Sequence, residues 1–276
     1  MQTMVPLYGF GGGSYAAIRK AAPRNLLDNS DFRNPVNQRG QASYSGSYVF
    51  CVDRWCVSSD AAITDSGLTC SGGNFLLQRM QLKKLPIGRY TGAVCAADGT
   101  IVCGSVEFTA SGSPEMIATE NGIVIFLQKL TSDTVQFVLN SGDQKTWVWA
   151  ALYKGEYTAA TLPEYRCKGY GAELAECQRY YQQFVGDAFL GSAIVGSDGV
   201  SLQGFIPLHT AMRVTPAIVG TFAFFDGTQT QTLEALQTFA LQGNGIRCSW
   251  VLKTAVAAKS VGFISAVGMA AFSADL

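Results

Sequence analysis

The sequence lacks several features that catalytic or metal sites require. Its 276 residues contain one histidine, His209. A multi-histidine metal site is therefore excluded, and a Ser-His-Asp arrangement would depend on this one residue. The neighbours Leu208 and Thr210 do not indicate a base, so we expect a hydrogen-bonded histidine at the edge of a strand. Neither a G-x-S-x-G motif nor a phosphate-binding loop is present, because no Lys-Ser/Thr pair follows the glycines at 9 and 11–13.

Charge is also scarce. Twenty Lys and Arg residues balance 20 Asp and Glu residues, so no net field attracts nucleic acid or an anionic membrane. Charged residues make up 14% of the chain, against about 25% in ordinary soluble domains. This favours either a β-rich protein with a Ser/Thr/Asn/Gln surface or an obligate oligomer that buries apolar surface between subunits.

Long apolar runs and paired cysteine motifs are missing too. The best candidate for a membrane span, 260–274, is shorter than the roughly 20 residues required and is predicted to be a buried strand pair. The eight cysteines form no C-x-x-C pair, which disfavours a zinc ribbon. Since the first residues do not have the pattern of a signal peptide, we expect cytosolic synthesis and reduced, mostly buried thiols.

Strand patterns dominate residues 25–170. Short runs of β-branched and aromatic residues alternate with turn residues, and the pair Asp98-Gly99 predicts a tight hairpin. The expected strands are 48–58, 75–82, 88–96, 101–108, 122–130, 134–139 and 146–153. Their number and spacing predict a β-sandwich domain.

The pattern changes period near residue 172. Leu174, Cys177, Tyr181 and Phe184 share one helical face, which predicts a helix over 172–185 within a linking segment, 171–187. A second, smaller β-sandwich domain is expected over 188–276. Its predicted strands are 200–207, 217–225, 231–241, 246–257 and 261–272. The predicted fold class is therefore all-β.

Acidic residues do not indicate catalysis. A glycan hydrolase needs two carboxyl groups roughly 5–10 Å apart across a cleft. Asp53, Glu107, Glu115 and Glu120 are candidates, but no spacing selects a pair. For Asp53 we expect a structural hydrogen bond or an ion pair with a nearby arginine.

Aromatic residues favour binding over catalysis. Sugar rings stack on aromatic planes, and the candidate ligand contacts are Tyr48, Trp55, Trp147, Trp149 and Tyr153. Trp147 and Trp149 are expected on one face of their strand, a pattern that a core position would also produce.

The N-terminal segment, 1–24, is apolar and interrupted by glycines. It is too short to fold alone. Its residues Leu7, Tyr8 and Phe10 favour an anchor that docks on a partner, with a flexible terminus as the alternative.

Four segments together carry a resemblance. They are NLLDNSDFRNPVNQRG (25–40) with VDRW (52–55), LPIGRYT (85–91), WVWAALYKGEYTAAT (147–161) and ELAECQRYY (173–181). Their order and spacing resemble the jelly-roll domain and following helix of bacteriophage tail-fibre and receptor-binding proteins, over about 25–184.

This resemblance implies a homotrimeric, non-enzymatic virion protein without cofactors, assembled in the host cytoplasm. It implies a carbohydrate-binding-like jelly roll that attaches to host-surface glycan, and an N-terminal segment that contacts other tail, baseplate or capsid proteins. No nucleic-acid partner and no membrane insertion are expected. Arg33 stands where related modules often carry a glutamate near a structural calcium, so no metal is expected, although Asn29 and Asp31 carry oxygens. A capsid or baseplate decoration protein and a glycan depolymerase are the alternatives.

Overall fold

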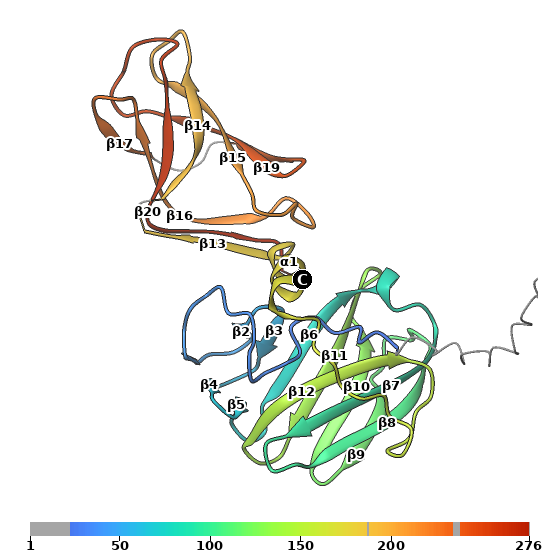
Figure 1. The fold of residues 1–276 in the computed structure, drawn as a ribbon. Coiled ribbons are helices and arrows are strands. Elements are labelled where there is room, and N and C mark those ends of the chain that lie inside the picture. The colour runs from blue at the N-terminus through green and yellow to red at the C-terminus, as the bar shows by residue number, and fades with distance from the viewer. Residues whose placement is uncertain (1–22, 187, 234–237, 276) are drawn as a thin grey trace, which may run out of the picture.

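A computed structural model describes residues 23–186, 188–233 and 238–275 of the chain. These residues form two β units connected through a short helix, so the predicted all-β fold is confirmed (Figure 1). Every strand pairing among the described residues is antiparallel, and so is the isolated bridge outside the named strands. The anchor residues Leu7, Tyr8 and Phe10 lie outside the described residues.

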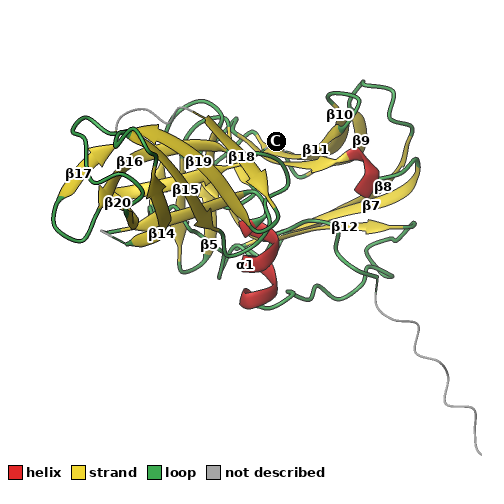
Figure 2. Ribbon diagram, turned by 90° about the horizontal axis from the view of Figure 1, so that it is seen from above, coloured by secondary structure: helices red, strands yellow, loops and turns green. Residues whose placement is uncertain are grey.

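The first unit is a β-sandwich of two six-stranded sheets, whose layers are separated in Figure 2. The first sheet has the strand order β1 (Ser43–Tyr44), β4 (Ala61–Thr64), β5 (Gly67–Cys70), β12 (Lys145–Lys154), β7 (Gly88–Ala96) and β8 (Ile101–Phe108). The second sheet has the order β2 (Val49–Val52), β3 (Trp55–Val57), β6 (Phe75–Gln81), β11 (Thr134–Ser141), β10 (Ile123–Lys129) and β9 (Glu115–Glu120). A single 3-10 turn, η1 (Leu82–Lys84), follows β6.

The sandwich core follows from alternation along the strands. In β10, Ile123, Ile125 and Leu127 are fully buried while the residues between them are not. Successive side chains of a strand point to opposite faces, so one face of β10 lines the core. Burying each such side chain stabilises the fold by about 1.5–3 kcal/mol.

A segment before β1 completes the edge of β12. The β5 strand pairs only with residues 145–147 of β12, which leaves the rest of that edge open. Residues 26–32 fill it through backbone hydrogen bonds from Leu26 N to Leu152 O and from Phe32 N to Val148 O, both 2.9 Å long. The segment that carries the tail-fibre resemblance therefore belongs to the sandwich.

The second unit is one eight-stranded sheet, here called the C-terminal sheet. Its order is β17 (Thr230–Leu233), β16 (Ala217–Phe225), β20 (Val261–Ser273), β14 (Phe189–Val195), β15 (Ser201–Pro207), β19 (Gly245–Val251) and β18 (Thr238–Gln242), with β13 (Tyr181–Val185) paired to β20. Inward side chains from these strands form a core of their own. A sandwich of two separate sheets was expected here, whereas the structure has one continuous hydrogen-bonded sheet that surrounds its core.

The long strand β20 makes this continuity possible. Along one edge, its residues 261–265 pair with β14 and its residues 269–273 pair with β13. Gly268 lies between the two paired stretches with a φ of 76°, a conformation that favours glycine. The expected strand pair at 260–274 is therefore a single strand with a change of partner.

Several predicted strands agree with the structure and others do not. The ranges 88–96, 101–108 and 217–225 match β7, β8 and β16. The expected strand 48–58 is instead the β2/β3 hairpin, which turns at Asp53 and Arg54, where Arg54 has a φ of 74°. The expected strand 231–241 is divided between β17 and β18, which pair with different neighbours, β16 and β19. The short strands β1, β4, β5, β9 and β14 were not predicted.

The predicted helix over 172–185 is wrong in its second half. Helix α1 spans Tyr170–Gln178, and β13 begins at Tyr181. The apolar spacing continues across this boundary, which is why the helix was predicted to extend further. In the structure each residue of Tyr181–Val185 pairs with a residue of β20, and this tertiary pairing overrides the local periodicity. Helix α1 does not have the length and apolar character to span a membrane, and neither does any other helix in the described ranges.

The cysteines have free thiols, as expected. Five are buried, among them Cys70, whose thiol pKa burial raises to about 12. Such thiols remain protonated at neutral pH and behave as small apolar residues. Cys167 is exposed.

Candidate functional site

The region around α1 is held by a buried ionic cluster. The Asp28 carboxylate is 3.1 Å from Lys168 Nζ, 3.6 Å from Arg54 Nε and 3.9 Å from Lys84 Nζ. Burial alone would raise the pKa of Asp28, but the three cations outweigh it and hold that pKa below its usual value. The Arg54 guanidinium also lies 3.4 Å from the ring centroid of Tyr180, just after α1. The cluster therefore ties the sandwich to the helix that follows it, and it is structural.

Arg39 connects the two units directly. Its guanidinium donates to Asp53 Oδ1 at 2.9 Å and to Asp275 Oδ2 at 2.8 Å, and lies 3.8 Å from the ring centroid of Tyr181. Gln38 Nε2 donates to both Asp53 Oδ2 and the carbonyl of Tyr181. The predicted ion pair between Asp53 and a nearby arginine is confirmed.

Asp53 gives this junction a pH dependence. Burial raises its pKa to about 6, because the ion pair with Arg39 only partly offsets the lost hydration. The native state therefore holds this proton up to a higher pH than the unfolded chain, whose carboxyl titrates near 4. The contribution of Asp53 to stability is present below pH 4 and lost as the pH rises through about 6.

We expect the free energy of unfolding of the wild type to fall relative to that of Asp53→Asn between pH 4 and pH 6.5. The reason is that the variant has no proton to lose at this position. Urea unfolding at four pH values in this interval measures the difference. The raised pKa would be contradicted if the difference between the two free energies of unfolding stayed constant, or if the wild type became more stable relative to the variant as the pH rises.

Two of the four carboxylates considered for glycan hydrolysis, Glu115 and Asp53, are engaged within the protein. Glu115 accepts hydrogen bonds from Thr109 and Ser111 and so stabilises the turn before β9. Asp53 is engaged at the junction as described above. Across the described part of the chain, no three His, Cys, Asp or Glu side chains are grouped to hold a metal ion. The side chain of Asn29 instead bonds backbone groups of Val36 and Asp53.

Three of the five predicted ligand-contact residues lie in the core. Trp55 is fully buried, and Trp147 and Tyr153 are 2% exposed. The indole N–H of Trp55 donates to the carbonyls of Asp28 and Asn29. A surface ligand does not reach these rings, so their role as ligand contacts is corrected to packing.

The remaining two candidates, Tyr48 and Trp149, reach the surface. Tyr48 is 60% exposed, just before β2. Trp149 is half-buried and stacks on Tyr165, with centroids 4.9 Å apart and planes 7° from parallel. An irregularity in the pairing of β12 with β7 lies between Trp147 and Trp149. Trp147 joins the core while Trp149 packs on Tyr165, between β12 and α1, contrary to the expectation that both lie on one face of the strand.

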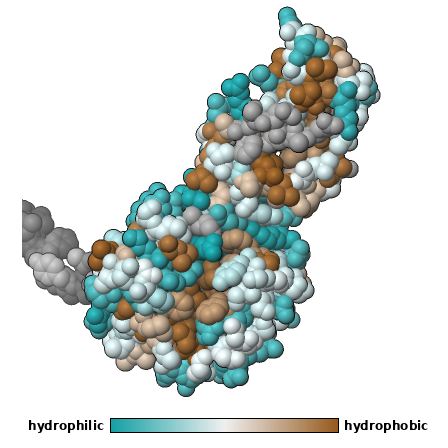
Figure 3. Space-filling model, turned by 180° about the vertical axis from the view of Figure 1, so that it is seen from behind, coloured by the Kyte–Doolittle hydropathy of each residue, from teal (hydrophilic) through white to brown (hydrophobic). Residues whose placement is uncertain are grey.

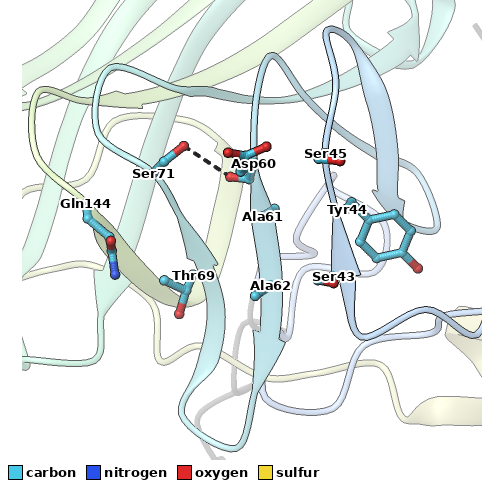
Figure 4. Close-up of a pocket in the computed structure, with 9 residues that line it drawn as sticks. All are labelled: Ser43, Tyr44, Ser45, Asp60, Ala61, Ala62, Thr69, Ser71 and Gln144. Carbon is cyan, nitrogen blue, oxygen red and sulfur yellow. Dashed lines mark hydrogen bonds between the residues drawn. The ribbon is translucent and has the colours of Figure 1, made fainter.

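A polar pocket of about 520 Å³ opens beside β1, β4 and β5 (Figure 4). Four hydroxyl groups, one carboxylate and one amide side chain line it, together with Tyr44 and two alanines. The polar lining residues are Ser43, Ser45, Thr69, Ser71, Asp60 and Gln144. Sequence reasoning missed this pocket because its residues come from three short unpredicted strands and the loop before β12.

Only some of the polar groups that line the pocket form hydrogen bonds within the protein. Ser71 Oγ donates to the backbone carbonyl of Asp60, and Thr69 Oγ1 bonds Thr146 Oγ1 at 2.8 Å. The phenol of Tyr44 donates outside the pocket, to Asn37 Oδ1. The Asp60 carboxylate and the Gln144 amide are drawn without a partner among the pocket residues in Figure 4. The arrangement offers donors and acceptors suited to a hydroxyl-rich ligand.

The single histidine does not take part in this site. His209 follows β15 and stacks on Phe184, with centroids 5.1 Å apart. Its backbone N–H donates to Gln182 Oε1. The position at a strand end agrees with the sequence expectation, and the ring stacking was not anticipated.

Comparison with known proteins does not place the chain in a family. No protein-family model matches the sequence, and no curated protein is significantly similar to it. The functional interpretation therefore rests on the geometry and on the sequence resemblance.

Proposed function

We propose that this protein is a non-enzymatic virion component, a tail-fibre or receptor-binding adhesin that attaches to host-surface glycan. The observation that carries the proposal is the polar pocket on the sandwich, where hydroxyl, amide and carboxylate groups converge without a catalytic carboxylate pair. In a homotrimer, several copies of a weak binding site would act together and raise the overall avidity for the host surface.

The topology of the first unit supports assignment to the jelly-roll class. The chain crosses repeatedly between the sheets: β2 and β3 lie in the second sheet, β4 and β5 in the first, β6 in the second, and β7 and β8 in the first. Antiparallel strands that exchange between two packed sheets are typical of jelly rolls. The assignment agrees with the resemblance of residues 25–40 and 147–161.

The chemistry of the pocket favours a neutral saccharide. A carboxylate accepts hydrogen bonds from sugar hydroxyls and an amide side chain both donates and accepts them, and the pocket holds a single charge, Asp60. Tyr44 is 5% exposed and offers little ring surface for stacking. Hydrogen bonding therefore dominates the proposed recognition, and each site alone binds weakly.

The test is binding of the full chain to an array of bacterial surface polysaccharides, followed by pocket variants. Gln144→Ala combined with Asp60→Ala should lower the apparent affinity for any bound glycan at least ten-fold, since two hydrogen-bonding groups are removed. Thr119→Ala, an exposed substitution on β9 in the opposite sheet, is the matched control and should bind as the wild type does.

The alternatives predict different results. A capsid or baseplate decoration protein would bind no glycan, even when displayed in many copies, and would bind other virion proteins instead. A depolymerase would release reducing ends from the polysaccharide. Either result would overturn the adhesin proposal.

A further inference from the structure

The outward face of the C-terminal sheet is apolar. Six large hydrophobic residues on its strands are between 42% and 70% exposed: Phe189, Ile194, Phe205, Val261, Phe263 and Val267. They alternate with buried residues such as Leu190, Ile206 and Ile264, which form the core on the other side. In Figure 3, hydrophobic residues also gather in patches on the surface of this unit.

Charge is nearly missing from this sheet. From β14 to β20, the strands carry one charged residue, Arg247, within their described bounds. Over 188–276 the chain has eight charged residues in 89. Charge is therefore scarcest in the second unit, and the only charged residue on the described strands of its sheet from β14 to β20, Arg247, is exposed and lies opposite Phe205.

Strand register gathers the apolar residues into one patch. Phe263 of β20 lies opposite Ser192 of β14 and Phe225 of β16, and Ser192 lies opposite Phe205 of β15. Val261 lies opposite Ile194 in the neighbouring row. Phe189 and Phe263 contact each other edge to face, with centroids 5.4 Å apart. The residues therefore form a continuous surface across four strands.

Two hollows flank the Phe189/Phe263 pair. One, of about 520 Å³, has Phe225 and Val267 in its wall and the small residues Ala223 and Ala266 in its lining. The other, of about 340 Å³, includes Phe205, Ile194 and Val261 together with the polar residues Gln203, Gln242 and Arg247. One surface thus presents both a projecting aromatic pair and depressions beside it, which is the relief that a contact between copies needs.

The size of the patch suits a subunit contact. Three phenylalanines at these exposures present roughly 330 Å² of ring surface, taking about 200 Å² for a fully exposed ring. With the three aliphatic residues the patch reaches on the order of 500 Å², close to the largest that monomers usually expose. Its Ser, Thr and Gln margin extends the area toward the roughly 800 Å² per partner of a stable interface.

We propose that this face packs against a second copy of the chain, with the Phe189/Phe263 pair of each copy seated among the hollows of its neighbour. The inference deepens, and rests on, the oligomeric part of the proposed function by naming the contact surface. A second copy accounts for the exposed rings and the scarcity of charge on this face together.

The test is the mass of the full chain in solution, by light scattering at micromolar concentrations. The wild type should have a mass of at least twice the 29.5 kDa of one chain. Phe189→Ser combined with Phe263→Ser should weaken self-association at least ten-fold and yield the monomer. Val261→Arg, which places a charge on the same face without touching the aromatic pair, is the second variant and should have the same effect.

The control is Ile87→Ser, which removes an equally exposed residue (70%) from the first unit and should leave the mass unchanged. Circular dichroism verifies that each variant is folded. A monomeric wild type would overturn both this inference and the proposed oligomer. A wild-type oligomer that persists in both face variants would overturn this inference alone and leave the proposed oligomer intact.

Discussion

Replacing Arg54 with leucine is expected to destabilise the protein by about 3 kcal/mol, the lower end of the cost of breaking a buried ion pair. The side chain is 1% exposed and pairs with Asp28, donates to the carbonyl of Arg79 at 2.6 Å, and stacks on Tyr180. Leucine removes all three interactions and leaves Asp28 with two lysines. Urea unfolding followed by tryptophan fluorescence measures the change.

A matched exposed pair provides the control for this prediction. Arg166 pairs with Glu164 at 2.9 Å, but both side chains are more than 70% exposed. Arg166→Leu should change the free energy of unfolding by less than about 1 kcal/mol, because water screens the pair. If Arg54→Leu were as mild as Arg166→Leu, the Asp28 cluster would not stabilise the contact between the sandwich and the segment around α1.

Replacing Trp55 with alanine is expected to cost about 3–5 kcal/mol, through the cavity it leaves and the lost indole hydrogen bonds. Trp55 contacts Phe32 and Phe137 edge to face, with centroids 5.1 Å and 6.3 Å away. Its N–H satisfies two backbone carbonyls, so Trp55→Phe should still cost about 1–3 kcal/mol. Thermal or urea unfolding measures both variants.

Tyr48→Ala is the corresponding surface control, because Tyr48 is 60% exposed. Its effect on stability should stay within about 0.5 kcal/mol. A Trp55→Ala variant that unfolded like the wild type would show that Trp55 does not hold the core. Trp55 and Tyr48 were both chosen as ligand candidates because they are aromatic. Comparing the two variants therefore also tests whether burial determines their effect on the free energy of unfolding.

Strands with regular alternation or clear turn signals were predictable. The ranges 88–96 and 101–108 were identified from β-branched residues flanking Asp98-Gly99, and they form β7 and β8. Short strands such as β1 and β4 were not, because two to four residues carry too little pattern. The boundary between α1 and β13 was missed because the pairing of Tyr181 with Ser273 involves residues more than 90 positions apart.

The candidate site was less predictable than the fold. The aromatic residues chosen for binding turned out to be mainly core, since a tryptophan in a strand has the same local sequence whether its face is covered or open. The polar pocket depends on β1, β4, β5 and a loop near Gln144 that meet only after folding. No local spacing could have associated Ser43 with Gln144.

Composition and patterns within a few residues were sufficient to predict the all-β class, the low charge and the free thiols. Which faces of the strands stay open depends on contacts between residues far apart in the chain. Trp55 and Phe263 are both aromatic strand residues, yet one is fully buried between two sheets and the other is 52% exposed on the outward face of the C-terminal sheet. Burial depends on what packs against a face, and that partner is brought there by long-range strand pairing.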